Sequence, residues 1–211
     1  MTQWLSNLFR NGIYALVIFL LGIPTFILFK MRVRGKEMIE AGKEYIIVAQ
    51  HRSYWDIPIL VIAFGLRNRI QFIAREGLKK NPIFRPLLHL FSTTIDRENF
   101  GRRDFRRVLQ AMRKERLIGI FPEGTTKAQA GAKTGVIHFA RLTCKLLLPV
   151  SLKADGPYPP RYPFRFPRVT VSIGKAISLK DLEKEVQILP ERSSERAFVL
   201  TKRLMERIDA T

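Results

Sequence analysis

The sequence predicts an α/β fold in which a largely parallel central sheet is flanked by helices, with a membrane-associated helical segment at the N-terminus. Two observations carry this prediction. Beyond residue 36, apolar runs of strand length alternate with segments of helical periodicity, as in β–α–β units. One long uncharged stretch precedes them. With 211 residues the chain can form one domain with its own core, and we expect an N-terminal segment at 1–34 and a globular domain at 35–211.

The N-terminal stretch from residue 12 to 29 contains no charged side chain. As a straight helix it would be about 26 Å long, slightly shorter than a hydrocarbon core of about 30 Å. Pro24 lies within the stretch and would kink a helix there. One tilted span and two short helices that dip into one leaflet therefore both remain open. If the stretch spans, the basic residues that follow place the rest of the chain on the cytoplasmic side, and either geometry holds the domain against the inner leaflet. No small-x-small site for signal cleavage follows the stretch.

Six short apolar runs have the length and composition of buried strands. We expect these strands at 45–49, 70–74, 93–95, 117–121, 146–151 and 169–173. Helices are expected at 55–64, 82–91, 100–114, 134–142 and 194–208, the last as an amphipathic closing helix. Residues 155–167 hold five prolines and predict an irregular loop. The aromatic and arginine side chains of this loop suit either the lipid interface or packing on the domain.

Charge and ligand chemistry narrow the class of protein. The chain has 37 Lys and Arg against 18 Asp and Glu, a net charge of +19, which predicts an anionic partner. Nucleic acid, acidic lipid headgroups and an acidic carrier protein are the candidates. The single cysteine, Cys144, cannot form an intrachain disulfide and is interpreted as a buried structural thiol. The three histidines are too scattered for a metal site, and His89 and His138 are interpreted as packed helix residues.

The first candidate site segment, residues 50–56, reads Gln-His-Arg-Ser-Tyr-Trp-Asp and follows the expected strand 45–49. His51 therefore emerges at the carboxyl end of a strand, where open α/β sheets place their sites. The chain can curl so that the Asp56 carboxylate meets one imidazole nitrogen while the other nitrogen takes a proton. This spacing predicts a general base without a protein nucleophile, although a His and an Asp five positions apart are weak evidence alone.

The second candidate segment, residues 121–126, reads Phe-Pro-Glu-Gly-Thr-Thr and also follows an expected strand. Gly124 allows the backbone to approach a ligand closely. Thr125, Thr126 and Lys127 supply donors for phosphate oxygens. Glu123 can be either a functional carboxylate or a structural acceptor of backbone hydrogens, and we favour the functional interpretation.

With these segments the sequence resembles the glycerolipid acyltransferases, in particular the bacterial 1-acyl-glycerol-3-phosphate (lysophosphatidic acid) acyltransferases. Four blocks match in order, at 51–56, 75–97, 121–125 and 147–150. The resemblance implies that His51 is the general base and Asp56 its orienting partner, in an acyltransferase catalytic domain at 35–211. It also implies that Glu123 and Gly124 take part in binding the acceptor.

The chain departs from the family pattern at three places that bear on the acceptor. Thr126 and Lys127 follow the third block where an arginine is usual, Arg75 replaces a lysine, and Arg85 stands where a glycine is expected. We expect a cationic set drawn from Arg75, Arg97 and Lys127 to hold the phosphate of the acceptor.

The implied reaction transfers a fatty acyl group from an acyl thioester to the free sn-2 hydroxyl of 1-acyl-glycerol-3-phosphate, forming phosphatidic acid at the cytoplasmic face of the inner membrane. No cofactor is implied, since acyl-ACP or acyl-CoA is a co-substrate, and the basic surface favours the acidic carrier protein. The expected partners are the lysophospholipid acceptor, the thioester and anionic membrane lipids. Another lysophospholipid or lipid acceptor is the alternative within this class. A basic nucleic-acid-binding protein is the alternative outside it, but the uncharged N-terminal stretch and the lack of a reading helix argue against nucleic acid.

Overall fold

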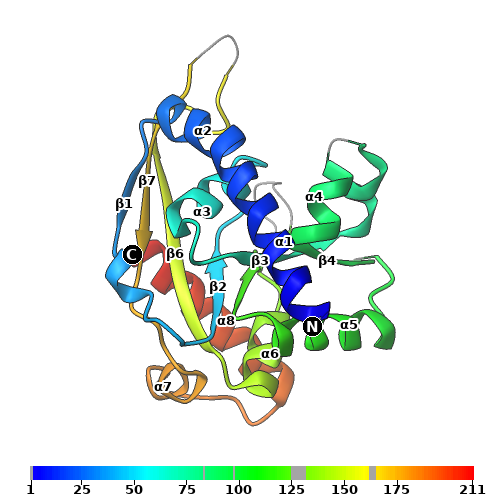
Figure 1. Ribbon diagram of the computed structural model, residues 1–211. Coiled ribbons are helices and arrows are strands. Elements are labelled where there is room, and N and C mark those ends of the chain that lie inside the picture. The colour runs from blue at the N-terminus through cyan, green and yellow to red at the C-terminus, as the bar shows by residue number, and fades with distance from the viewer. Residues whose placement is uncertain (1, 83, 97, 125–131, 162–164) are drawn as a thin grey trace.

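The computed structural model describes residues 2–82, 84–96, 98–124, 132–161 and 165–211 (Figure 1). Within them, one seven-stranded sheet has the order β1-β7-β6-β2-β5-β3-β4. The strands are β1 Arg32–Arg34, β2 Tyr45–Ala49, β3 Ile70–Arg75, β4 Ser92–Ile95, β5 Leu117–Ile120, β6 Leu146–Asp155 and β7 Arg168–Ile173. Neighbouring strands are parallel except β6 and β7, which pair antiparallel. The predicted fold class, α/β with a largely parallel sheet, is confirmed.

The middle of the sheet explains why the strands read as continuous apolar runs. All five residues of β2 are buried, and β2 pairs in parallel with β5 on one side and β6 on the other. Tyr45 lies opposite Leu117 and Leu146, so the three strands start level with one another. Because helices cover both faces of such a sheet, neither face of β2 needs polar side chains. The carboxyl ends of β2 and β5 consequently meet at the same edge.

Two layers of helices enclose the sheet (Figure 1). The helices are α1 Thr2–Val17, the π-helical turn η1 Ile18–Gly22, α2 Ile23–Leu28, η2 Lys36–Met38, α3 Asp56–Phe64, η3 Glu76–Lys80, α4 Phe84–Phe91, α5 Arg102–Lys114, α6 Gly135–Thr143, α7 Leu179–Lys184 and α8 Ser193–Ala210. One core lies between the sheet and α3. The other core lies between the opposite face and α5, α6, α7 and α8. Val108 and Met112 bury one face of α5, while its arginines are mostly exposed, as the periodicity predicts.

The N-terminal segment forms one helical run through α1, η1 and α2 rather than two separated helices. Pro24 lies in the first turn of α2, directly after the π-helical turn, in which the Ile23 amide donates to the Ile18 carbonyl. The stretch Leu8–Leu28 is long and apolar enough to cross a membrane. Its inner side packs on the domain: a Cβ at Gly22 would lie 3.1 Å from the Ile62 side chain of α3. Its outer side exposes large apolar side chains.

The middle of α1 is tied to the amino ends of β3 and β5 by a cluster of polar contacts around Glu115, here called the Glu115 cluster. The Arg10 guanidinium donates to Glu115 Oε1 over 2.8 Å and to Gln71 Oε1 over 3.1 Å. Arg69 donates to Glu115 Oε2 over 3.2 Å. Arg10 and Glu115 side chains are only 14% and 12% exposed. The N-terminal run is therefore fixed to the domain at two places, by the Glu115 cluster in the middle of α1 and by Phe29 just after α2.

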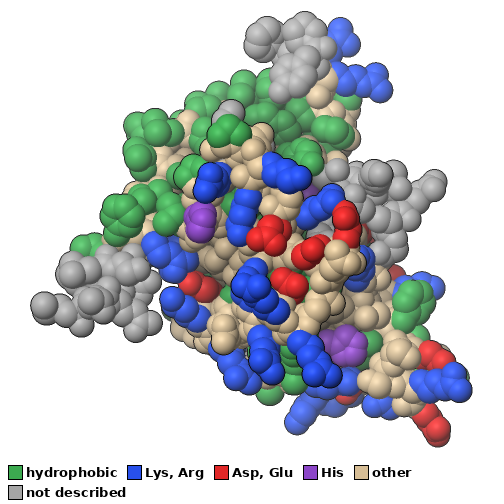
Figure 2. Space-filling model, turned by 90° about the vertical axis from the view of Figure 1, so that its right-hand side faces the viewer, with side chains coloured by type: hydrophobic (Ala, Val, Ile, Leu, Met, Phe, Trp, Pro, Cys, Tyr) green, Lys and Arg blue, Asp and Glu red, His purple; other side chains and the backbone are tan. Residues whose placement is uncertain are grey.

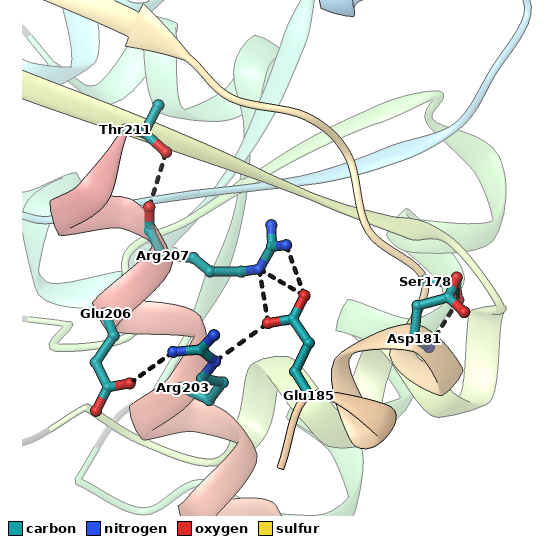
Figure 3. A network of polar contacts seen from close by, with 7 residues as sticks. All are labelled: Ser178, Asp181, Glu185, Arg203, Glu206, Arg207 and Thr211. Carbon is teal, nitrogen blue, oxygen red and sulfur yellow. Dashed lines mark hydrogen bonds and ion pairs between the residues drawn. The ribbon is translucent and has the colours of Figure 1, made fainter.

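The C-terminal helix α8 closes the second core with a buried face that contains Ala197, Leu200 and Leu204, as its periodicity predicts. Its outer face reaches the end of α7 through Glu185, which accepts hydrogen bonds from Arg203 and Arg207 (Figure 3). The guanidinium of Arg207 lies 2.6 Å from Glu185 Oε1. These exposed pairs orient α8 against α7.

Three sequence predictions differ from the structure. Strand β1 was not predicted, because it contains only one apolar residue and so forms no apolar run. It lies inside the range 1–34 assigned to the N-terminal segment, but it pairs with β7 and is part of the sheet. The interpretation of Cys144 as a buried thiol is wrong: it lies just past the end of α6 with φ of 56°, and its side chain is exposed. His89 was expected to pack, but it is exposed on α4.

Candidate active site

The turn between β2 and α3 brings His51 and Asp56 into contact. His51 Nδ1 lies 3.0 Å from Asp56 Oδ2. The same oxygen accepts the backbone amides of Arg52 at 2.7 Å and Ser53 at 2.8 Å. Asp56 is the first residue of α3 and is 1% exposed, so these donors replace the water that a buried carboxylate loses. The contact orients the imidazole with Nδ1 toward the carboxylate and leaves Nε2 for a substrate proton.

The segment after β5 holds His51 from the other side. Glu123 Oε2 accepts the backbone amide of His51 over 2.8 Å. The His51 ring stacks on Phe121, with ring centres 4.3 Å apart and an angle of 20° between planes. Gly124 has φ of 65°, a conformation that favours glycine, and its amide closes a turn onto the Phe121 carbonyl at 2.9 Å. The two segments singled out in the sequence thus meet, and the described contact of Glu123 is a structural one with the backbone.

A cavity of about 490 Å³ opens beside His51. Its walls are mostly apolar and come from β3, α5, β5 and α6, among them Phe72, Val108 and Phe139. Such a lining suits an apolar chain. His138 of α6 also lines it and is only partly buried, whereas the sequence interpretation made it a packed helix residue. The apolar periodicity of α6 shows which face of the helix is turned inward, but it does not distinguish a face that lines a cavity from one that packs in the core.

The predicted phosphate-binding residues are placed only in part. Arg75 lines the rim of the cavity at the end of β3, and its guanidinium pairs with Glu98. Its side chain is 54% exposed, so this pair is open to solvent. Arg97, Thr125, Thr126 and Lys127 lie outside the described residues.

Asp96, next to these residues, closes a turn. Its Oδ1 accepts the backbone amides of Glu98 at 3.0 Å and Asn99 at 3.1 Å. These hydrogen bonds hold the pKa of Asp96 below its ordinary value. These contacts give the Asp96 carboxylate a structural role.

Tyr158 is the site residue that sequence reasoning missed. It follows β6, and its hydroxyl donates a hydrogen bond to Asp56 Oδ1. Burial, together with the charge of Asp56 and this hydrogen bond, raises the pKa of the Tyr158 phenol well above its ordinary value. The only signal in the sequence was the cluster of aromatic residues in the loop 155–167. Of these rings, Tyr158 and Phe166 pack on the domain, and residues 162–164 lie outside the described part.

In the described part of the chain, no three His, Cys, Asp or Glu side chains come together in a way that could hold a metal ion.

The two site segments lie within the region that matches known proteins. The family model described as "Acyltransferase" matches residues 30–153, which include both site segments. A 1-acyl-sn-glycerol-3-phosphate acyltransferase of Bacillus subtilis (strain 168) is 26% identical over 182 residues, 84% of this chain and 86% of that protein. A protein of the same name from Streptococcus pneumoniae (strain ATCC BAA-255 / R6) is 26% identical over 144 residues, 67% of this chain. The matched part spans only 53% of that relative.

Among solved structures, the fold is similar to the crystal structure of the 1-acyl-sn-glycerophosphate (LPA) acyltransferase PlsC from Thermotoga maritima. The TM-score is 0.63, with 96% of this chain and 88% of that chain covered. At 20% sequence identity this likeness concerns the fold.

Proposed function

Because the chain belongs to the acyltransferase family and is an O-acyltransferase, we propose that it transfers a fatty acyl group from a thioester to the free sn-2 hydroxyl of 1-acyl-glycerol-3-phosphate, forming phosphatidic acid. The contact of 3.0 Å between His51 and Asp56 beside an apolar cavity carries the proposal. The names of the two relatives support this acceptor. The family match, rather than the charge, decides for an enzyme over a nucleic-acid-binding protein.

In the proposed mechanism, His51 acts as general base through Nε2. It removes the proton of the acceptor hydroxyl as the oxygen attacks the thioester carbonyl. The tetrahedral intermediate then collapses, the bond from carbon to sulfur breaks, and the proton passes from His51 to the departing thiolate. Asp56 keeps the proton of the neutral imidazole on Nδ1 and stabilises the imidazolium between the two steps. No acyl-enzyme forms.

The cavity and its rim offer places for the two ends of the substrates. Its apolar walls suit a fatty chain, because burying each CH₂ group contributes about 0.8 kcal/mol. At the rim, Arg75 would exchange the Glu98 carboxylate for the phosphate of the acceptor, which is a stronger acceptor of guanidinium hydrogen bonds. Arg97 and Lys127 are proposed to complete the phosphate site.

The outer side of the N-terminal run supports a membrane location. Exposed apolar side chains follow it from Leu8 to Leu28. The inner side is docked on the domain through Arg10 and Gly22, so a crossing of the bilayer would carry the charged Glu115 cluster into hydrocarbon. We therefore propose that the run lies in one leaflet, at the cytoplasmic face of the inner membrane. Figure 2 shows hydrophobic side chains gathered toward the upper left of one face of the molecule, with many basic and several acidic side chains below them.

The donor is proposed to be an acyl thioester of a carrier protein or of coenzyme A, with no cofactor. The net charge of +19 favours the acidic carrier protein. Because Thr126 and Lys127 replace the usual arginine, another lysophospholipid acceptor is the second candidate.

An acceptor panel tests the proposal. Purified enzyme in mixed micelles is given a labelled acyl thioester, as acyl-ACP or acyl-CoA, with lysophosphatidic acid, lysophosphatidylcholine, lysophosphatidylglycerol or glycerol-3-phosphate. Mass spectrometry should find phosphatidic acid formed from lysophosphatidic acid at least about tenfold faster than any other product. The two phosphodiester acceptors lack the second charge of the lysophosphatidic acid phosphate, and a lost hydrogen bond to a charged group costs about 1.5–3 kcal/mol. Glycerol-3-phosphate keeps the phosphate but lacks the acyl chain that the apolar cavity would bury. Faster acylation of another acceptor would contradict the assigned substrate and leave the reaction type intact.

A further inference from the structure

We propose that Tyr158 is a positioning residue of this active site, which fixes the Asp56 carboxylate so that its Oδ2 atom holds His51 in the orientation needed for proton transfer. This inference rests on the proposed function, because it assigns a role relative to the His51–Asp56 pair.

The two oxygens of Asp56 are held in different ways. Oδ2 receives His51 Nδ1 and two backbone amides of the preceding turn. Among the described residues, the hydroxyl of Tyr158 is the donor to Oδ1. A carboxylate rotates about its bond to Cβ, and in a side chain that is 1% exposed an oxygen without a donor competes for the donors of its neighbour. Tyr158 removes this competition, so Oδ2 stays with His51.

The phenol acts as a donor, and not as a second base. Burial is the largest effect on the pKa of Tyr158, and the charge of Asp56 and the hydrogen bond to it raise this pKa further, so the phenol keeps its proton. A hydrogen bond with the Ser53 side chain and the charge of Arg52 oppose the shift without reversing it. The ring does not line the cavity beside His51. Tyr158 therefore acts on the reaction through Asp56, without touching a substrate in the cavity.

The ring of Tyr158 is itself held by packing between distant segments. Phe29, just after α2, meets it edge to face with ring centres 6.3 Å apart. Phe29 also packs on Trp55 at 5.2 Å and on Phe166 at 5.1 Å. The Val169 amide of β7 donates to the Phe29 carbonyl over 2.9 Å, which joins the end of the N-terminal run to the connection between β6 and β7. Trp55 directly precedes Asp56, so this aromatic cluster supports both partners of the Tyr158–Asp56 contact.

The first test compares two conservative variants in the lysophosphatidic acid assay. Tyr158→Phe removes the hydroxyl and keeps the ring in its packing. We expect kcat to fall about 10- to 100-fold, as for the loss of a hydrogen bond to a charged group, with KM for both substrates within about twofold. Tyr14→Phe is the matched control, because Tyr14 is also a buried tyrosine and its hydroxyl makes no side-chain hydrogen bond among the described residues. It should keep the wild-type kcat.

The second test asks whether Tyr158 acts through Asp56. In an Asp56→Asn background, with residual turnover followed by label over long incubations, adding Tyr158→Phe should change kcat by less than about twofold. A full multiplication of the two losses would overturn the inference, as would a Tyr158→Phe enzyme with wild-type kcat or with a changed KM alone. Thermal melting of each variant shows that it is folded.

The wild-type enzyme separates the two proposals. If it acylates none of the acceptors, the proposed function fails. If it is active and Tyr158→Phe is equally active, the positioning role alone fails.

Discussion

Two carboxylates, the buried Asp56 and the partly buried Glu115, lie at opposite ends of neighbouring parallel strands and are held by different kinds of donor. Asp56 follows the carboxyl end of β2, while Glu115 precedes the amino end of β5. Apart from His51, the donors to Asp56 are neutral: two backbone amides and the Tyr158 phenol. Glu115 meets two guanidinium groups, from Arg10 and Arg69.

The difference in donors separates a working carboxylate from a structural one. Neutral donors satisfy the oxygens of Asp56 but leave its negative charge uncancelled, so the charge remains available to an imidazolium on His51. Two arginines neutralise the charge of Glu115, and the ion pair with Arg10 fixes α1 to the sheet. Substitutions at the two ends should consequently change different quantities: the rate at the Asp56 end and the free energy of unfolding at the Glu115 end.

The largest effect is expected at the Asp56 end, from His51→Ala. Without a general base, kcat should fall about 10²- to 10⁴-fold, while the melting temperature stays close to that of the wild type because His51 is partly exposed. Initial rates with labelled acyl thioester measure the loss, and circular dichroism checks the fold. Retained activity in a folded variant would refute the assignment of His51.

At the opposite end, Glu115→Gln should leave kcat unchanged in detergent and lower the free energy of unfolding by about 2 kcal/mol, since Arg10 and Arg69 lose their counter-charge. Denaturant unfolding measures the change. Glu185→Gln is a matched control, because Glu185 also pairs with two arginines but on the surface, where such pairs contribute little (Figure 3). A drop in kcat for Glu115→Gln at an unchanged free energy of unfolding would contradict the proposal that Glu115 stabilises the fold and Asp56 supports catalysis.

A smaller effect on rate is expected from Glu123→Ala, which removes the acceptor of the His51 backbone amide and leaves the imidazole pair in place. A lost hydrogen bond to a charged group predicts a fall in kcat of about tenfold, with KM for the acceptor nearly unchanged. Glu123→Gln keeps an acceptor oxygen and should recover most of the rate. If Glu123 binds the acceptor directly, as the family resemblance implies, KM rises instead and steady-state kinetics will show it.

The smallest effect concerns pH. Burial raises the pKa of Glu115, but hydrogen bonds and charges from Arg10 and Arg69 outweigh it and hold this pKa below the ordinary value of 4.5. A carboxyl with a lowered folded pKa stabilises the protein fully above its unfolded pKa and loses this contribution as pH falls through the folded pKa. The stability difference between wild type and Glu115→Gln should therefore be constant well above pH 4.5 and shrink as the pH falls below that ordinary value. A constant difference would show that Glu115 does not stabilise through its charge.

The sequence by itself determined the fold class and the local part of the site. Apolar runs fixed the strands from β2 to β7, because a strand buried on both faces has nowhere to place a charge. His51 and Asp56 lie within one turn between a strand and a helix, so their spacing, taken together with the second segment at 121–126, indicated that they meet. The turn at Gly124 was readable for the same reason.

Only the tertiary structure decided the contacts between distant segments. Tyr158 reaches Asp56 across 102 residues, and Arg10 reaches Glu115 across 105. β1 joins the sheet through pairing with β7 and not through an apolar run of its own. Periodicity records which face of an element is buried, but the partner of a polar side chain depends on how remote elements pack. No local pattern carries that information.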